Sequence, residues 1–278
     1  DLFDGDDNVL SFADPRIRLT AQSNIGIPLR ASFAMTSVND RSGATESVTV
    51  DRITMNAPGA YGQTAVSNIW LGASDRDVPA EYTFTACPVN DLIRISPDDI
   101  AIRTEVRTDT DLTDSRACFY PKDAFARIAY TAEIPLAPAA DFRGQTDQTV
   151  DEVFDADLID YLFSGGSAEI YGRVTNSLPL NFDMNLIVTD AADVPVGIDF
   201  EPQKVKGGGL GTDGEVSDVS FVITEADMPK MKNARNLRIR LEAYCDDALA
   251  GRHLRPDQQA KLTLKLRKSG GINITTNE

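Results

Sequence analysis

Two prolines fall inside segments that otherwise alternate between apolar and polar residues as β-strands do. NIGIPLRASFAMTSVND, residues 24–40, contains Pro28, and NSLPLNFDMNLIVTD, residues 176–190, contains Pro179. Proline has no amide hydrogen, so it is tolerated only at an edge, a bulge or the start of a strand. We therefore expect each proline to mark the point where the chain leaves one strand, begins the next and crosses to the facing sheet.

The two segments also match each other residue by residue. Pro179 lies 151 residues after Pro28, and this offset superimposes the apolar positions that follow. These positions are Leu29, Ala31, Phe33 and Met35 in one segment and Leu180, Phe182, Met184 and Leu186 in the other. The repeat predicts two related β-sandwich domains, although coincidence in a β-rich chain would also explain it.

Short alternating runs recur along the rest of the chain. ESVTVDRITM, AVSNIWLGA, DIAIRTEVRT, ARIAYTAEIPL, NLRIRLEAY and AKLTLKLRK are separated by clusters of Gly, Asp, Asn and Pro. Such spacing is typical of β-sandwiches. We predict an all-β fold of two immunoglobulin-like β-sandwich domains in tandem, residues 1–122 and 123–278, with the boundary in FYPKD near residue 120.

Few helices are expected. Thr149 and Glu152 have the spacing of a capping box, and an apolar stripe follows them up to Gly165-Gly166, which predicts a helix over 151–163. Thr224 with Asp227 indicates a second short helix through about residue 234. Ser96-Pro97-Asp98-Asp99 is interpreted as a single helical turn.

Charge excludes some partners. The chain has 278 residues, 43 of them acidic and 27 basic, and a formal net charge of −16. This surface repels nucleic acid and disfavours electrostatic docking on anionic lipid. No apolar run approaches the roughly 20 residues of a transmembrane helix. The start at DLFDGDDN, without Met, is expected to be a mature N-terminus.

The three cysteines are Cys87, Cys118 and Cys245. None belongs to a C-x-x-C motif, so a zinc knuckle is not expected. An odd number allows at most one internal disulfide. Cys87 and Cys118 are the nearer pair, but the sequence alone does not decide whether they are bridged.

Two resemblances follow from these motifs. NIGIPL and NSLPL are similar to the N-x-x-(I/V)-P pattern of the late-embryogenesis-abundant type of β-sandwich. AEIPLAP, the acidic segment ending DYLF, the strand pair around Pro179, the Gly-rich loop and LTLKLRKSGGINI resemble cell-surface lipoproteins of Bacteroidetes over roughly residues 125–278. The resemblance implies an outer-membrane-anchored or extracellular protein, with an export signal and a lipid-bearing Cys upstream of Asp1. It carries over no catalytic residues.

Aromatic residues are the candidates for ligand binding. Sugars stack on exposed rings, and Trp70 and Tyr61 could provide them, with Tyr82 as a weaker candidate. Trp70, however, stands in an alternating run between Ile69 and Leu71, which favours burial in the core instead.

Acidic clusters raise the question of calcium. Asp109, Asp111 and Asp114 in DTDLTD are the candidate ligands, since calcium takes several oxygens at once. No segment matches the EF-hand frame of Asp, Asn and Gly followed by Glu, and no other cofactor is expected.

Nucleophilic and phosphate-binding chemistry is poorly supported. His253, the only histidine, lies in the polar segment AGRHLRPDQQ, and no G-x-S-x-G motif is present. The Gly-rich segment KGGGLGTDGEV, residues 206–216, leads into a strand rather than a helix. We interpret it as a hairpin connection and His253 as a surface residue.

These observations favour a non-enzymatic cell-envelope protein that acts in binding, adhesion or assembly. Its partner would be another envelope protein or a glycan, because a sandwich edge can receive a partner's strand. A carbohydrate-binding module for polysaccharide capture is the main alternative. A carboxylate-based hydrolase and a lipid-binding sandwich remain open, as does the oligomeric state.

Overall fold

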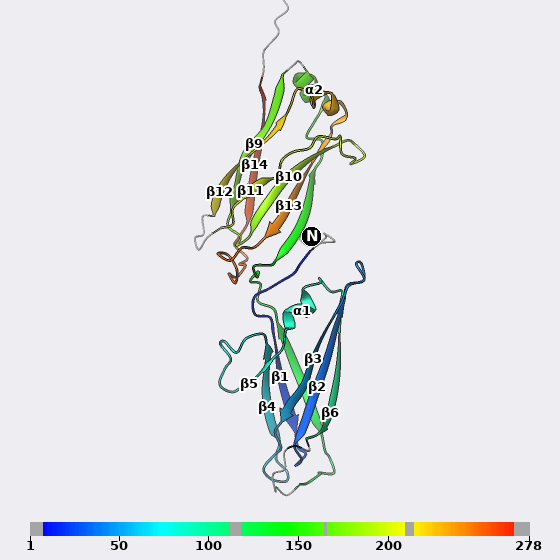
Figure 1. Ribbon diagram of the computed structural model, residues 1–278, viewed down its shortest axis with the longest axis vertical. Helices are drawn as coiled ribbons and strands as arrows, with labels where there is room; N and C mark the ends of the chain where they lie inside the picture. The colour runs from blue at the N-terminus through cyan, green and yellow to red at the C-terminus, as the bar shows by residue number, and fades with distance from the viewer. Residues whose placement is uncertain (1–7, 110, 112–117, 164–165, 209–213, 270–278) are drawn as a thin grey trace, which may run out of the picture. The chain divides into compact units, whose positions relative to one another are not determined.

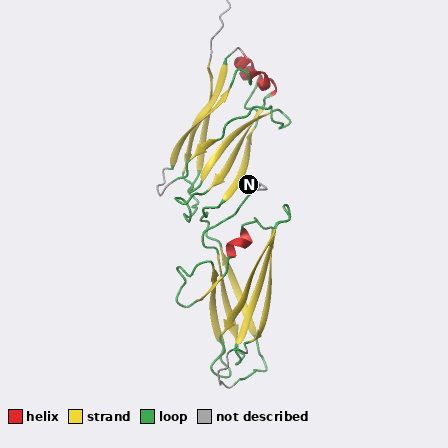
Figure 2. Cartoon of the chain, viewed as in Figure 1, coloured by secondary structure: helices red, strands yellow, loops and turns green. Residues whose placement is uncertain are grey.

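A computed structural model describes residues 8–109, 111, 118–163, 166–208 and 214–269. The chain divides into two compact units: Val9–Ala137, here called the N-terminal unit, and Pro138–Glu278 with Asp1–Asn8, here called the C-terminal unit. Strands dominate both units, which confirms the predicted all-β class, and helices are few and short (Figures 1 and 2). The immunoglobulin-like topology stays a prediction.

The N-terminal unit consists of two sheets and one short helix. Its elements are β1 (Arg16–Ser23), β2 (Leu29–Val38), β3 (Thr45–Met55), β4 (Ala65–Gly72), β5 (Thr83–Ala86), α1 (Val89–Ile93), β6 (Asp99–Thr108) and β7 (Ala126–Glu133). One sheet has the order β5-β4-β1-β7 and the other β3-β2-β6 (Figure 1). Alternate residues of β1 to β4 point between the sheets and form the core, which α1 closes with Val89 and Leu92.

The C-terminal unit repeats this plan with one more strand in its second sheet. Its elements are β8 (Arg143–Val150), α2 (Ala156–Phe163), β9 (Ser167–Asn176), β10 (Asn181–Thr189), β11 (Gln203–Val205), β12 (Glu215–Ile223), the 3-10 helix η1 (Met228–Asn233), β13 (Asn236–Tyr244) and β14 (Ala260–Ser269). The sheets have the orders β12-β9-β14 and β11-β10-β13-β8.

Strand pairing shows that the two units share one connectivity. β1 pairs with β4 and β7 as β9 pairs with β12 and β14, and β2 pairs with β3 and β6 as β10 pairs with β11 and β13. Pro28 and Pro179 both lie in the connection from the first sheet to the second. The prediction that each proline marks a crossing between sheets is confirmed.

At each of the two crossings one residue forms a reciprocal pair of hydrogen bonds with a distant segment, and the side chain that accepts differs between the units. Asn24 donates its backbone N–H to the Phe125 carbonyl, and the Phe125 N–H returns a bond to Asn24 Oδ1 at 2.8 Å. Ser177 donates its N–H to the Gln259 carbonyl, and the Gln259 N–H returns a bond to Ser177 Oγ at 2.8 Å. An amide thus does in one unit what a hydroxyl does in the other.

The residues that precede Asn24 and Ser177 also differ between the two units: Ser23 in one and Asn176 in the other. Ser23 Oγ accepts from the Ile25 N–H, and Asn176 Oδ1 accepts from the Leu178 N–H, both two residues along. Asn176 is fully buried, and its amide also donates to the carbonyls of Leu180 and Lys206. The Ser-Asn of one crossing therefore matches the Asn-Ser of the other.

Several predicted boundaries differ from the structure. The division falls after Ala137 rather than after Lys122, because β7 pairs along its whole length with β1. The helix predicted over 151–163 starts only at Ala156, since Thr149 continues β8 and Asp155 Oδ1 accepts from the Leu158 N–H in place of the expected capping box.

The shorter helices also differ. The segment 96–99 is not a helical turn: Ser96 has a positive φ of 52° and β6 begins at Asp99, while α1 precedes it. The predicted Thr224–Asp227 cap is present as a hydroxyl–carboxylate bond of 2.6 Å, but the helix that follows is of the 3-10 type and begins at Met228.

The Gly-rich segment is not a hairpin connection. It links β11, in one sheet, to β12, in the other, so it is a second crossing. Gly207 and Gly208 lie against the chain at Leu180 and Ser177, where an added Cβ would come within 2.9 Å and 2.6 Å of backbone atoms. Close backbone approach explains these two glycines.

Candidate functional site

The predicted aromatic platform is not formed, because Trp70 belongs to the core. Its side chain is 3% exposed, contacts the Tyr82 ring edge-on at 5.7 Å and lies 4.7 Å beneath the Arg16 guanidinium. Tyr61 is 69% exposed and meets Phe119 edge-on at 5.9 Å. Tyr61 is thus accessible, but Trp70 does not join it in a surface site.

The predicted calcium ligands are engaged by an arginine. Arg52 Nη2 donates to both carboxylate oxygens of buried Asp109, at 2.8 and 3.0 Å, and Nη1 donates to Asp111 at 2.8 Å. The hydrogen bonds that Arg52 donates to Asp109 raise the pKa of Arg52. Asp114 lies outside the described residues, so calcium binding by all three stays an untested prediction; an ion would have to displace Arg52.

Asp109 has a structural task that the sequence did not disclose. It directly follows β6, accepts from the Asp111 N–H and donates its own N–H to the Pro28 carbonyl. Asp246 holds the equivalent place after β13, where its carboxylate accepts from the Ala248 N–H. Both aspartates form Asx turns at the end of matching strands.

The remaining sequence candidates do not assemble into a reactive centre. His253 is exposed in a loop, as expected for a surface residue. Within the described ranges, no group of three or more His, Cys, Asp or Glu side chains is placed to hold a metal ion. Burial raises the pKa of the thiols of Cys87 and Cys245 to about 11, Cys118 is exposed, and no disulfide joins them.

The outer edge of β6 is the feature that most resembles a binding site. β6 is the last strand of its sheet, and in the described part of the chain no strand pairs with its outer side. The matching strand of the C-terminal unit, β13, is covered on that side by β8 across eight residue pairs, from Arg143 opposite Tyr244 to Val150 opposite Leu237. One unit therefore has a strand where the other has none.

The effect of this missing neighbour can be seen by comparing the exposed fractions of equivalent side chains on β6 and β13. The strand registers make Ile100, Ile102 and Val106 of β6 equivalent to Leu237, Ile239 and Ala243 of β13. The three β6 side chains are 39%, 41% and 41% exposed, whereas those of β13 are 4%, 8% and 3% exposed. They lie opposite buried residues of β2, such as Met35, and so face the interior of the unit.

A groove of about 350 Å³ opens along this edge. Its walls come from Ile100 and Ile102 of β6 and from Ile128 and Tyr130 of β7, and its floor includes core residues such as Phe33. β7 is likewise the last strand of its sheet, and Tyr130 is 63% exposed. Unpaired backbone groups beside an apolar groove form a site for an added strand.

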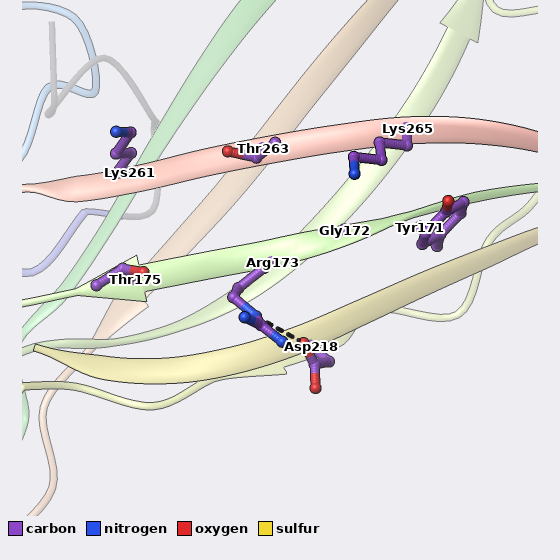
Figure 3. Close-up of a pocket in the computed structure, with 8 residues that line it drawn as sticks. All are labelled: Tyr171, Gly172, Arg173, Thr175, Asp218, Lys261, Thr263 and Lys265. Carbon is purple, nitrogen blue, oxygen red and sulfur yellow. Dashed lines mark hydrogen bonds and ion pairs between the residues drawn. The ribbon is translucent and has the colours of Figure 1, made fainter.

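The C-terminal unit has a different hollow, on the outer face of the β12-β9-β14 sheet. It has a volume of about 490 Å³ and is lined by Tyr171, Gly172, Arg173, Thr175, Asp218, Lys261, Thr263 and Lys265 (Figure 3). Arg173 pairs with Asp218 at 3.1 Å, which leaves the two lysines of β14 as the remaining cations of the lining. The hollow is polar and basic, unlike the groove beside β6.

No described helix combines the length and the apolar character that crossing a membrane requires.

The chain is similar to proteins of known structure. The crystal structure of a Parabacteroides distasonis protein, provisionally described as secreted, has 30% sequence identity and a TM-score of 0.71 over 97% of this chain and 78% of its own. The infectious bursal disease virus VP2 subviral particle reaches a TM-score of only 0.29 at 11% identity, over 92% of this chain and 57% of its own, and carries no argument.

A family of proteins of unknown function, DUF4621, matches residues 1–274. No curated protein matches the chain.

Proposed function

We propose that the chain, which belongs to the DUF4621 family of proteins of unknown function, is a non-enzymatic assembly module of the cell envelope or its exterior. Its working surface is the β6 edge of the N-terminal unit, which accepts an extended strand from a partner. The partner's backbone continues the β3-β2-β6 sheet, and its apolar side chains enter the groove between β6 and β7.

A single observation carries this proposal: three apolar side chains that face inward are exposed on β6 and buried on the equivalent strand β13. Exposed apolar edges promote aggregation, and natural proteins normally cover them or place charges on them. The charged residues of β6, Arg103, Glu105 and Arg107, alternate with the inward-facing row of Ile100, Ile102 and Val106, so this row carries no charge of its own, and no strand in the described part of the chain covers it. A covering strand would bury these residues as β8 covers β13.

Location outside the cytoplasm is supported by the Parabacteroides distasonis relative, which is described as secreted. An acidic chain with a net charge of −16 suits a soluble envelope or surface protein. A lipid anchor upstream of Asp1 remains part of the proposal, to be tested by labelling the native protein with a fatty-acid analogue.

Strand acceptance is tested by binding of synthetic ten-residue peptides with apolar residues at alternate positions, and of scrambled peptides of the same composition. The full chain should bind the alternating peptides only, measured by fluorescence anisotropy. Ile102→Lys should abolish binding, because an inward charge blocks an edge. Val222→Lys, at an exposed strand position of the other unit, is the matched control. Equal binding by both variants would disprove the proposed site.

Glycan capture is the second candidate, and the basic hollow around Tyr171 favours it. The guanidinium carbon of Arg267 lies 4.8 Å from the centre of the Tyr171 ring. Lys261 and Lys265 supply positive charge on an otherwise acidic protein. An acidic polysaccharide is the glycan class that this charge selects. The double variant Lys261→Ser and Lys265→Ser should lose binding on a glycan array, whereas Tyr61→Ser should retain it; an array without any signal removes this candidate.

A further inference from the structure

We propose that the strand accepted by β6 comes from residues 270–278 of a second copy of this chain. This inference rests on the proposed function and names its partner. Residues 270–278 directly follow β14, and their sequence is GGINITTNE. Repetition of the same contact from copy to copy would join the molecules head to tail, because donor and acceptor lie on different surfaces.

The length of the segment matches the space. In the C-terminal unit, β8 covers β13 with eight residue pairs and runs antiparallel to it. A donated strand of residues 270–277, shifted by one residue from the register of β8, would lie beside residues 99–106 of β6 and pair Ile274 with Ile102. Residues 270–278 supply nine residues, which suffice for these eight pairs.

The sequence of the segment suits an apolar groove. Ile272 and Ile274 are two residues apart and would point to the same side of a strand. Residues 272, 274, 275 and 276 are β-branched, and the segment contains no proline and one charged residue, Glu278. The two isoleucines would enter the groove, with Ile272 opposite Thr104 and Ile274 opposite Ile102, both of which line it.

Other parts of the chain suit the groove less well. Residues 1–7, DLFDGDD, contain four aspartates, whose burial against isoleucines would be costly. Pairing with β6 would use eight of the nine residues 270–278, so at most one residue would separate β14 from the paired strand. A second copy provides the strand without that restriction.

Charge predicts how the association responds to salt. Each copy carries a net charge of −16, so copies repel each other at low ionic strength. Salt screens this repulsion and leaves the apolar and backbone contacts largely intact. The association should therefore strengthen between 10 and 300 mM NaCl, roughly the range over which the Debye length falls from about 30 Å to below 8 Å.

The test mixes two full-length variants that are each defective in one half of the contact. Ile272→Asp with Ile274→Asp removes the donor, and Ile102→Lys removes the acceptor. Each variant alone should sediment as a monomer, and an equimolar mixture should give a dimer of twice the monomer mass. The wild-type chain should form larger species as its concentration rises. Val222→Lys should behave as wild type.

Folding of each variant is checked by circular dichroism and by the fluorescence of Trp70, the only tryptophan. A covalent version pairs Ile102→Cys with Ile274→Cys on two separate chains that both carry Cys118→Ser. Cα atoms of paired strands lie about 5 Å apart, within reach of a disulfide. Oxidation should yield a cross-linked dimer from the mixture and none from a mixture with Val222→Cys as acceptor.

Monomers in every sample, with no cross-link, would overturn self-assembly. So would protection of β6 amides in the wild-type monomer that is lost in the donor variant, because the segment would then fill its own groove. If alternating peptides still bind at Ile102, strand acceptance stands and only the identity of the donor is wrong. If they do not bind, the proposed function fails first.

Discussion

The C-terminal unit covers the outer side of β13 with β8, whereas the N-terminal unit leaves the equivalent side of β6 exposed. The six common strands pair identically in the two units, and three equivalent inward positions of β6 and β13 are apolar in both, whereas Thr104 of β6 corresponds to Leu241 of β13. The same pattern is therefore core in one unit and surface in the other. The presence or absence of one additional strand, β8, decides whether this apolar row is buried in the core or exposed at the surface.

β8 covers its neighbour mainly with backbone rather than with apolar side chains. Its sequence, RGQTDQTV, is polar, and most of its side chains are exposed. Phe142 and Phe154, which flank the strand in sequence, are each 1% exposed. A strand donated to β6 would have to supply both the backbone bonds and the apolar side chains.

The largest expected difference between β6 and β13 is in the hydrogen-exchange rates of their backbone amides. Alternate amides of β6 point away from β2 and should exchange within seconds in the monomer, whereas both sets of β13 amides are bonded. A difference in opening free energy of about 4 kcal/mol corresponds to roughly a thousandfold in rate. Hydrogen exchange read by NMR measures it, and slow exchange throughout β6 would show that the edge is already covered.

Truncation of one isoleucine in each unit tests the same contrast in stability. Ile239→Ala should lower the free energy of unfolding by about 2–5 kcal/mol, as for buried aliphatic residues, and Ile102→Ala by less than about 1 kcal/mol. Trp70 fluorescence reports the N-terminal unit alone, and circular dichroism reports both. Similar losses for the two variants would mean that Ile102 is not exposed in solution.

A smaller effect on stability is expected from substitutions at the two sheet crossings. Asn176→Ala leaves the carbonyls of Leu180 and Lys206 without their donor, the first of them in a buried bond, and should cost about 1–3 kcal/mol. Ser23→Ala, at the matching place, removes one bond to the Ile25 N–H and should cost less. Urea denaturation gives both values, and a larger loss for Ser23→Ala would contradict the assignment of equivalent roles.

The smallest effect concerns the ion pair that ties β8 to β13. Arg240 donates to both oxygens of Asp147, at 2.8 and 2.9 Å, and this lowers the pKa of Asp147. A lowered pKa stabilises the fold above the unfolded-state pKa near 4, and the contribution is lost as the pH falls through the folded-state pKa. Asp147→Asn should cost at most about 1 kcal/mol at pH 7.

Urea titrations of Asp147→Asn and wild type at pH 7 and pH 3 check this sign. The difference between them should shrink at the lower pH. A difference that grows on acidification would mean that the pair does not favour the ionised carboxylate.

The sequence was sufficient for what depends on local pattern. Alternation predicted β2, β10 and β14, and the two prolines predicted the crossings, because proline acts through its own missing N–H. The repeat was visible for the same reason, although the asparagines that begin the NIGIPL and NSLPL motifs, Asn24 and Asn176, are not structurally equivalent. Ser23 corresponds to Asn176 and Asn24 to Ser177, which only the bonding pattern reveals.

The sequence was insufficient where distant strands decide the outcome. β8 is too polar to be identified as a strand, and its partner lies about ninety residues along the chain. Ile100 and Ile102 alternate like core residues, and nothing near them indicates that no strand covers them. The groove was therefore missed, while Trp70 was a candidate only because its ring is large; its neighbours Ile69 and Leu71 correctly favoured burial.

The pairing of β1 with β7 has a mechanical consequence. Arg16 lies opposite Glu133, and the Ala13 N–H donates to the Ala137 carbonyl, so the chain enters and leaves the N-terminal unit at the same end of one sheet. Tension along the polypeptide would peel these strands apart one bond at a time. A donor strand of the kind proposed, pulled along the length of β6, would instead load all its bonds together and should resist a higher force than the β1–β7 pair.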